Sequence, residues 1–237
     1  MDTFIALDVE TANRSNQGSI CQIGIAKYTN GILVDSFETL INPNDNFSQN
    51  NISIHGITPN DVADAPTFPE AIKGILTFIG THHIVAHTSF DKRALNKACH
   101  DHDLETINNP WTDSALIARR TWDEVSKRGY NLPNLCDILD FEYEAHDALE
   151  DAKACANVLL SAMEHSEVNL AKIISRGQTK AKSRKSYPLV YNKKETLKAS
   201  TTDKQLFFQA TFPYHELRPQ LLRVKRVIPL KTTFPKK

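Results

Sequence analysis

The segment that decides the fold is FIALDVET, residues 4–11. Its first half, Phe4 to Leu7, is a short apolar run of the kind that forms a buried strand. Two acids follow at Asp8 and Glu10. Residues two apart in a strand point to the same face. The strand predicted over residues 3–9 therefore ends with two carboxylates side by side.

Two adjacent carboxylates repel each other as free anions, so a protein that places them together needs something to neutralise them. A divalent cation does this, and hard oxygen ligands favour magnesium or manganese. Alone, the Asp8-x-Glu10 pattern is a weak indication, because two solvent-exposed acids at a strand end are commoner than a metal site.

The segments around this strand predict a mixed α/β sheet covered by helices. Further strands are expected at 20–28 and 31–41, joined through Asn30-Gly31, a strong hairpin signal, and the result is an antiparallel meander. Residues 42–66 are polar and predict loops with a short helical turn. Beyond them, a short strand at 84–86 and a second short element at 111–113 should alternate with helices at 68–79, 91–101, 114–121, 132–139 and 148–164.

A second acid follows the predicted strand at 84–86. The segment VAHTSFD runs from this strand through a small polar turn to Asp91 at the start of a helix. Asp is also a favoured helix cap, so capping explains this residue about as well as chemistry does.

A third group opens the last helix, in the segment HDALED at 146–151. Asp147 and Glu150 have the spacing of a capping box, and we assign them that structural role. His146 then lies just before the helix and Asp151 in its first or second turn. With His146 outside the helix, both side chains can face one cleft, although a histidine beside acids is usually a surface residue.

Taken in order, these motifs resemble the DnaQ-like DEDDh 3′→5′ exonuclease family, which includes the DNA polymerase III epsilon subunit and ribonuclease T. The resemblance covers about residues 3–164. It rests on FIALDVET at 4–11, ICQIGIAKY at 20–28, IHGITPNDVADAPTF at 54–68, VAHTSFDKRAL at 85–95 and HDALEDAKACANVLL at 146–160.

The resemblance implies an RNase H-like fold and a catalytic set of Asp8, Glu10, Asp91, His146 and Asp151. The four carboxylates would hold two divalent cations, Mg²⁺ or Mn²⁺, and His146 would be the general base. It also implies substrate contacts from Val9, Thr11, His55 and Phe90.

One segment departs from the commoner family pattern, H-N-x-x-F-D. Here His87-Thr88-Ser89-Phe90-Asp91 is one residue shorter and lacks the asparagine. The shortening puts the placement of Asp91 and of the 3′-end contacts in question, although no catalytic group is lost.

Charge divides the chain of 237 residues. Residues 1–175 hold 12 Lys/Arg and 25 Asp/Glu, a formal −13, whereas residues 176–237 hold 16 and 3, a formal +13. We expect an exonuclease domain at 1–172, a basic linker at 173–187, and a basic C-terminal region at 188–237 with or without a small folded element. A basic tail with interspersed tyrosines suits a nucleic-acid strand; a plain solubilising tail is the alternative.

The sequence predicts a cytoplasmic protein, with no signal peptide and no apolar run long enough for a membrane. The four scattered cysteines predict buried free thiols. The expected function is hydrolysis from the 3′ end of nucleic acid, with single-stranded DNA favoured. Alternatives are an RNA 3′-trimming exoribonuclease and a non-catalytic nucleic-acid-binding or polymerase-associated module. The sequence does not identify a polymerase or homo-oligomer partner.

Overall fold

The computed structural model describes residues 2–178. The predicted C-terminal region at 188–237, and the linker beyond Gln178, lie outside these residues. Helix α7 (Leu170–Gln178) runs into the segment predicted as linker, and the division into domains stays a prediction.

A five-stranded mixed sheet forms the centre, in the order β3-β2-β1-β4-β5. Strands β1 (Thr3–Thr11), β2 (Ile20–Thr29) and β3 (Ile32–Leu40) form the predicted antiparallel meander, and β4 (His83–Ala86) and β5 (Trp111–Asp113) run parallel to β1. The turn between β2 and β3 has Asn30 and Gly31 at φ 51° and 80°, as a tight hairpin requires. The predicted RNase H-like α/β architecture is confirmed.

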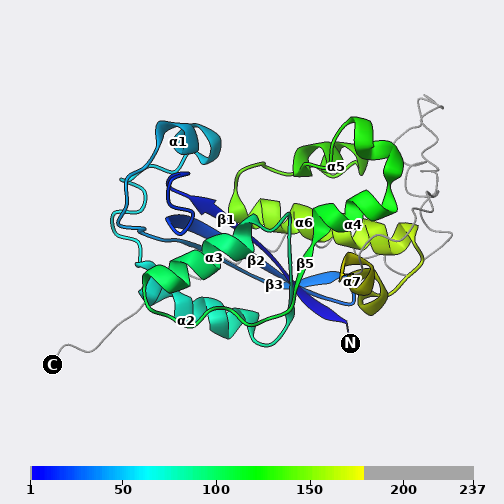
Figure 1. The fold of residues 1–237 in the computed structure, drawn as a ribbon, viewed down its shortest axis with the longest axis horizontal. Coiled ribbons are helices and arrows are strands. Elements are labelled where there is room, and N and C mark those ends of the chain that lie inside the picture. The colour runs from blue at the N-terminus through cyan, green and yellow to red at the C-terminus, as the bar shows by residue number, and fades with distance from the viewer. Residues whose placement is uncertain (1, 179–237) are drawn as a thin grey trace, which may run out of the picture.

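Helices cover both faces of the sheet (Figure 1). Helices α2 (Phe68–Ile79) and α3 (Phe90–Asp101) lie on one face. The other face carries α4 (Ser114–Thr121), α5 (Leu132–Ile138), α6 (Ala148–His165) and α7. Two further pieces are α1 (Gln49–His55) and a 3₁₀ turn at Asp123–Lys127. Polar composition hides α1 from a hydrophobic pattern, which explains why only a helical turn was expected there.

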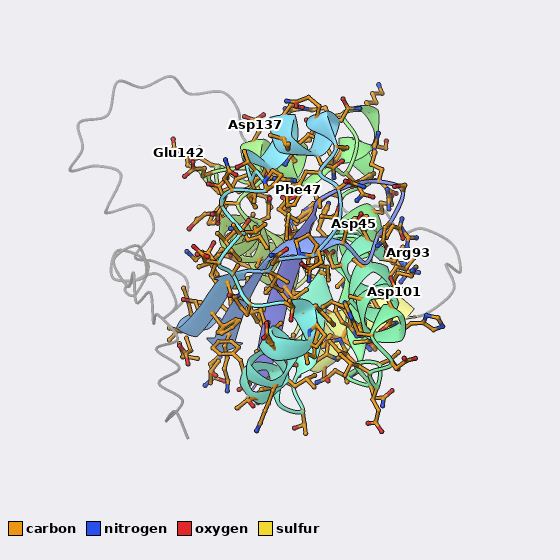
Figure 2. All side chains as sticks on the ribbon, turned by 90° about the vertical axis from the view of Figure 1, so that its left-hand side faces the viewer. Asp45, Phe47, Arg93, Asp101, Asp137 and Glu142 are labelled. Carbon is orange, nitrogen blue, oxygen red and sulfur yellow. The ribbon has the colours of Figure 1, made fainter. Side chains whose placement is uncertain are left out.

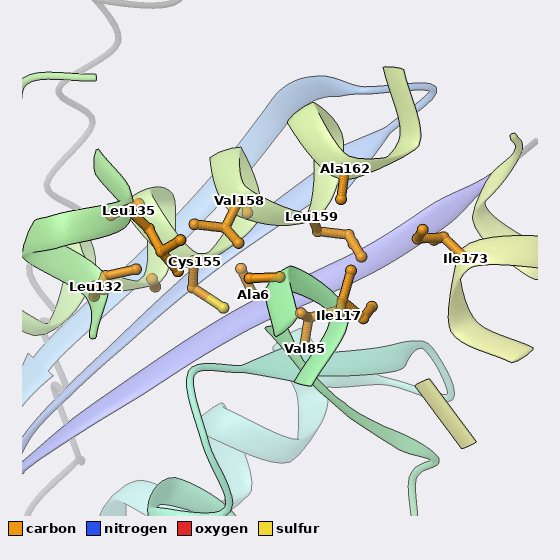
Figure 3. Packing of buried hydrophobic residues seen from close by; sticks show 14 of the residues in the cluster. Ala6, Val85, Ile117, Leu132, Leu135, Cys155, Val158, Leu159, Ala162 and Ile173 are labelled. Atoms are coloured by element: carbon orange, nitrogen blue, oxygen red, sulfur yellow. The ribbon is translucent and has the colours of Figure 1, made fainter. Parts of the chain in front are cut away.

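The two-residue period of β1 divides the core. Phe4 and Ala6 pack toward α6, whereas Ile5, Leu7 and Val9 pack toward α2 and α3. Figure 3 shows the α6 side, where Leu159 and Val158 lie near Ala6 and Ile117. All four cysteines are buried and free, as predicted. Among the helices within residues 2–178, none is long and apolar enough to cross a membrane.

Candidate active site

Strand β1 supplies the first two acids. Asp8 and Glu10 continue the row of Phe4 and Ala6, so they point to the α6 side of the sheet at the end where the hydrophobic core stops. The register of β1 against β2 shifts between Glu10 and Thr11, so the strand is irregular immediately beyond the two acids.

Asp91 reaches the same place from α3. The residue is only 2% exposed. The Val9 backbone N–H donates to Asp91 Oδ1 at 3.2 Å, which ties α3 to β1. Among the described residues Asp91 Oδ2 has no hydrogen-bond partner. Burial raises the pKa of Asp91 to about 7, although its hydrogen bonds from backbone N–H groups oppose the shift. A buried carboxylate oxygen without a partner needs a ligand or a proton.

Asp151 and His146 come from the beginning of α6. The N–H of His146 donates to Asp151 Oδ2 at 2.8 Å. His146 itself adopts φ 70°, a left-handed conformation that histidine tolerates better than most residues, and its side chain is exposed. The turn thus holds His146 beside Asp151 instead of along the helix.

The capping prediction for this helix is confirmed for one partner and wrong for the other. Asp147 caps α6 by accepting from the N–H groups of Leu149 and Glu150 at 3.1 and 3.0 Å. Glu150 does not return a bond to the cap. It pairs instead with Lys153, one turn along, at 2.6 Å, because a cation at that spacing competes for the carboxylate.

A glycine allows α6 to approach the acids. Gly24 on β2 lies opposite Asp8 in the sheet. A Cβ atom at Gly24 would lie 2.2 Å from the backbone of Ala148 and Leu149. Gln22, two residues earlier, accepts from the Ala148 N–H at 3.3 Å. The first turn of α6 therefore packs directly on β2, which brings Asp151 to Asp8 and Glu10.

The resulting cluster concentrates negative charge. Burial is the main reason that the pKa of Asp8 lies well above its usual range, and Asp91, Asp151 and Glu10 add to the shift. Burial, with Asp151 and Asp91 as further causes, raises the pKa of Glu10 to about 8. The pKa of Asp151 is raised as well, again mainly by burial.

These side chains fit a divalent cation. Glu10, His146 and Asp151 each offer a ligand atom, and the three atoms lie within 4.8 Å of one another. Asp91 Oδ2 adds a buried oxygen that lacks a partner among the described residues. Hard oxygen donors at this density suit Mg²⁺ or Mn²⁺. The five predicted catalytic residues thus meet at one end of the sheet.

Helix α1 closes the other side of this site. Its residues Asn51 and His55 bond the Thr11 carbonyl at the end of β1, through Nδ2 at 2.7 Å and Nε2 at 3.2 Å. His55 Nδ1 accepts from the Ile57 N–H at 3.0 Å, so the proton of the ring is on Nε2 and the ring is neutral. Burial lowers the pKa of His55, in agreement with this tautomer.

A cavity of about 400 Å³ lies between α1, α3 and the loop after β1. It contains three of the four predicted substrate-binding residues. The fourth, Val9, has its side chain in the core at 3% exposure and its N–H on Asp91, so the structure does not bring it to this cavity. The lining is formed by Glu10, Thr11, Asn13, Arg14, Gln17, Asn51, Ile54, His55 and Phe90.

Sequence reasoning missed several lining residues. Asn51 and Ile54 lie in the segment expected to be mostly loop, and Arg14 and Gln17 in a polar connection without a motif. A further omission is Tyr143, whose hydroxyl is buried without a partner of good geometry among the described residues. It lies next to Asp151, where it opposes the rise in the pKa of that carboxyl that burial causes.

The shortened VAHTSFD segment is accommodated by strain. Thr88 has φ 77°, which is unusual for a β-branched residue. His87 fixes the turn, because its two ring nitrogens contact Ser114 Oγ at 2.8 Å and the Tyr130 carbonyl at 2.9 Å. Asp91 still accepts from the Val9 N–H of β1, so the turn that is one residue shorter than the commoner pattern leaves Asp91 in contact with the strand.

Comparisons with known proteins identify the family of the domain that carries this site. The exonuclease family model for RNase T-type domains matches residues 5–159. Similar proteins include PolC-type DNA polymerase III of Oceanobacillus iheyensis, 37% identical over 161 residues, and that of Bacillus cereus, 31% identical over 166. These matches cover 67% and 69% of this chain but only 11% of each relative.

Solved structures show the same fold. Exonuclease X in complex with 5′-overhanging duplex DNA aligns with a TM-score of 0.59 at 23% identity, covering 73% of this chain and 99% of that one. The nuclease domain of 3′hExo, a DEDDh family member bound to rAMP, aligns with a TM-score of 0.59 at 22% identity, covering 69% and 92%. The chain belongs to the DnaQ-like exonuclease family, whose RNase T-type domain model matches most of the described residues.

Proposed function

We propose that this protein is a metal-dependent 3′→5′ exonuclease that acts on single-stranded DNA. The observation that carries the proposal is the convergence of four acids and His146 from β1, α3 and α6 at one end of the sheet. Family membership supports the reaction class, and the similarity to PolC-type DNA polymerase III supports DNA as the substrate.

The adjoining cavity supplies the place for the terminal nucleotide. Its volume of about 400 Å³ lies in the range of small-ligand sites. Phe90 and Ile54 offer apolar surface to a base, and Ile54 is 49% exposed without a ligand. Thr11 offers a hydroxyl to a sugar, and His55, whose two ring nitrogens already bond Thr11 and Ile57, would offer its ring surface. The scissile phosphate would then lie at Glu10, where the cavity meets the acids.

Asp8, Glu10, Asp91 and Asp151 would hold two divalent cations, Mg²⁺ or Mn²⁺. When bound, the cations neutralise charge on the scissile phosphate and make water more acidic. His146 would accept the proton from the attacking water. Its exposed ring lies beside Glu10 and Asp151, which supports this role, and general base catalysis contributes about 10²–10⁴ in rate.

Two other functions compete with this one. An exoribonuclease would use the same acids, and the 3′hExo nuclease domain of similar fold was solved with rAMP. A binding module would retain the fold without turnover. The full set of acids, around an Asp91 oxygen that has no partner within residues 2–178, favours catalysis, because buried carboxylates that repel each other give a binding protein no advantage.

The test is degradation of matched 5′-labelled single-stranded DNA, double-stranded DNA and RNA by wild type and Asp8→Asn, with Mn²⁺, with Mg²⁺ and with EDTA. We expect a ladder of shortened single-stranded DNA with metal, absent in EDTA and in the variant. Faster loss of RNA would instead identify an exoribonuclease. An intact substrate in every lane, with strand binding retained, would identify a binding module.

A further inference from the structure

The loop between β1 and β2, residues 12–19, is held in a fixed shape by its own asparagines. Asn13 is 7% exposed, and its Oδ1 accepts from Ser15 Oγ and from the Asn16 N–H, both at 2.8 Å. Its Nδ2 donates to the Asn46 carbonyl at 2.7 Å. The loop is therefore rigid around the residue that follows Asn13.

The rest of the loop is tied to the elements on either side. Asn16 Nδ2 donates to Asp45 Oδ2 at 3.0 Å; Asp45 is labelled in Figure 2, which views the molecule from this end. Gly18 packs against α3 so closely that a Cβ atom there would lie 2.9 Å from Asp101 Oδ2. The position of the loop over the cavity is thus set before any substrate arrives.

Arg14 is an exposed residue of this loop. Within residues 2–178 its guanidinium makes no hydrogen bond and no ion pair, so nothing in that part of the chain uses its charge. It lines the same cavity as Glu10, and it is the one cation among the lining residues, since His55 is neutral. The loop therefore presents, in the lining of the same cavity as Glu10, a positive charge that no described residue uses.

Residues 1–175 carry a formal charge of −13, so the site repels a polyanion except where cations offset it. A terminal nucleoside beyond the scissile phosphate is uncharged. The natural partner of Arg14 is therefore a phosphodiester of the neighbouring nucleotides, which guanidinium binds with charge-assisted hydrogen bonds.

We propose that Arg14 binds a non-scissile phosphodiester of the substrate strand and so makes the enzyme prefer a polynucleotide to a single esterified nucleotide. This inference rests on the proposed exonuclease function. Arg14 acts on strand binding and leaves the reacting atoms to the acids and His146.

The test compares two substrates in Mn²⁺, a single-stranded oligonucleotide and the 4-nitrophenyl ester of thymidine 5′-monophosphate, which has no second phosphodiester. For Arg14→Gln we expect kcat/KM on the oligonucleotide to fall on the order of tenfold, mostly through KM, with the salt dependence of log kcat/KM shallower by about one charge. On the ester, which lacks the phosphodiester that Arg14 would bind, kcat/KM should stay within about twofold of wild type.

Two further variants sharpen the result. Arg14→Lys keeps the charge and should retain the wild-type salt slope. Lys73→Gln removes an exposed charge from α2 and should match wild type on both substrates. An equal loss on both substrates for Arg14→Gln would overturn the proposal, as would an unchanged salt slope. If wild type cleaved neither substrate, the exonuclease function itself would fail; an active wild type with an indifferent Arg14→Gln would reject only the role of Arg14.

Discussion

The two halves of β1 have opposite surroundings. Phe4 to Leu7 are at most 1% exposed and pack between helices on both faces. One step along the same strand, Asp8 and Glu10 bring carboxyl groups into a crowded site that raises their pKa values. The first half stabilises the fold, whereas the second half costs stability until something neutralises it. Functional sites commonly show this local conflict with folding.

The contact between α6 and β2 brings Asp151 to Asp8 and Glu10, and Gly24→Ala should break this contact. A Cβ 2.2 Å from the backbone of Ala148 and Leu149 forces the first turn of α6 away from the sheet. We expect a loss of about 3 kcal/mol or more in the free energy of unfolding, together with loss of cleavage.

Gly74→Ala is the matched control, because nothing lies within 4 Å of a Cβ there. It should be neutral or stabilising by up to about 1 kcal/mol, since Ala is the better helix former. Urea denaturation measures both. A folded, active Gly24→Ala protein of wild-type stability would show that α6 does not need this close approach.

His146→Asn should lower catalysis and leave the stability of the fold unchanged. Asparagine tolerates the left-handed backbone at φ 70°, so the turn before α6 should persist. We expect kcat to fall by about 10²–10⁴ while the melting temperature changes little. His100→Asn, on the exposed end of α3, is the control. Near-normal kcat for His146→Asn would remove His146 from the role of general base.

Leu159→Ala should lower the stability of the fold and leave catalysis unchanged. Leu159 is fully buried in the cluster that contains Ala6, so truncation leaves a cavity and should cost about 2–5 kcal/mol. The kcat of the remaining folded enzyme should be unchanged at a temperature well below its transition. Leu76→Ala, at a residue 42% exposed, should cost within about 0.5 kcal/mol. A large drop in kcat for folded Leu159→Ala would mean that packing of the core and catalysis cannot be changed independently.

Thr88→Gly gives the smallest expected effect. Glycine adopts φ 77° without penalty, so relief of strain should exceed the added entropy of the unfolded chain and stabilise by about 1 kcal/mol. Thr88→Ala keeps the strain and loses the Oγ1 that accepts from the Phe90 N–H, so this variant should not be more stable than wild type. A Thr88→Gly protein less stable than Thr88→Ala would contradict strain at this turn.

Sequence patterns were sufficient for the strands and for most helices, whereas the gathering of Asp8, Glu10, Asp91, His146 and Asp151 was implied by the resemblance to the exonuclease family. They work because strand period and helix capping are local. Long-range packing explains the misses. The partner of Glu150 is decided by Lys153, which competes with the helix cap for its carboxylate. The importance of Gly24 appears only when α6 is packed on β2. Arg14 belongs to no motif and is recognised by the cavity it lines.

The most direct test of the conflict within β1 is the pH dependence of thermal unfolding for metal-free wild type, Asp8→Asn and the exposed-site control Glu105→Gln. Carboxyls whose folded pKa values are raised stabilise the protein at low pH and lose that contribution as pH rises through the folded values. Those values are about 7 for Asp91 and about 8 for Glu10, so the window runs from about pH 4 to 8.

We predict that metal-free wild type and Glu105→Gln lose melting temperature steeply across this window, and that Asp8→Asn loses less and melts higher at pH 8. Mn²⁺ should then raise the melting temperature of wild type and have little effect on Asp8→Asn. An Asp8→Asn protein that melts below wild type without metal, or that gains as much from Mn²⁺, would contradict the view that these acids are held together for a cation.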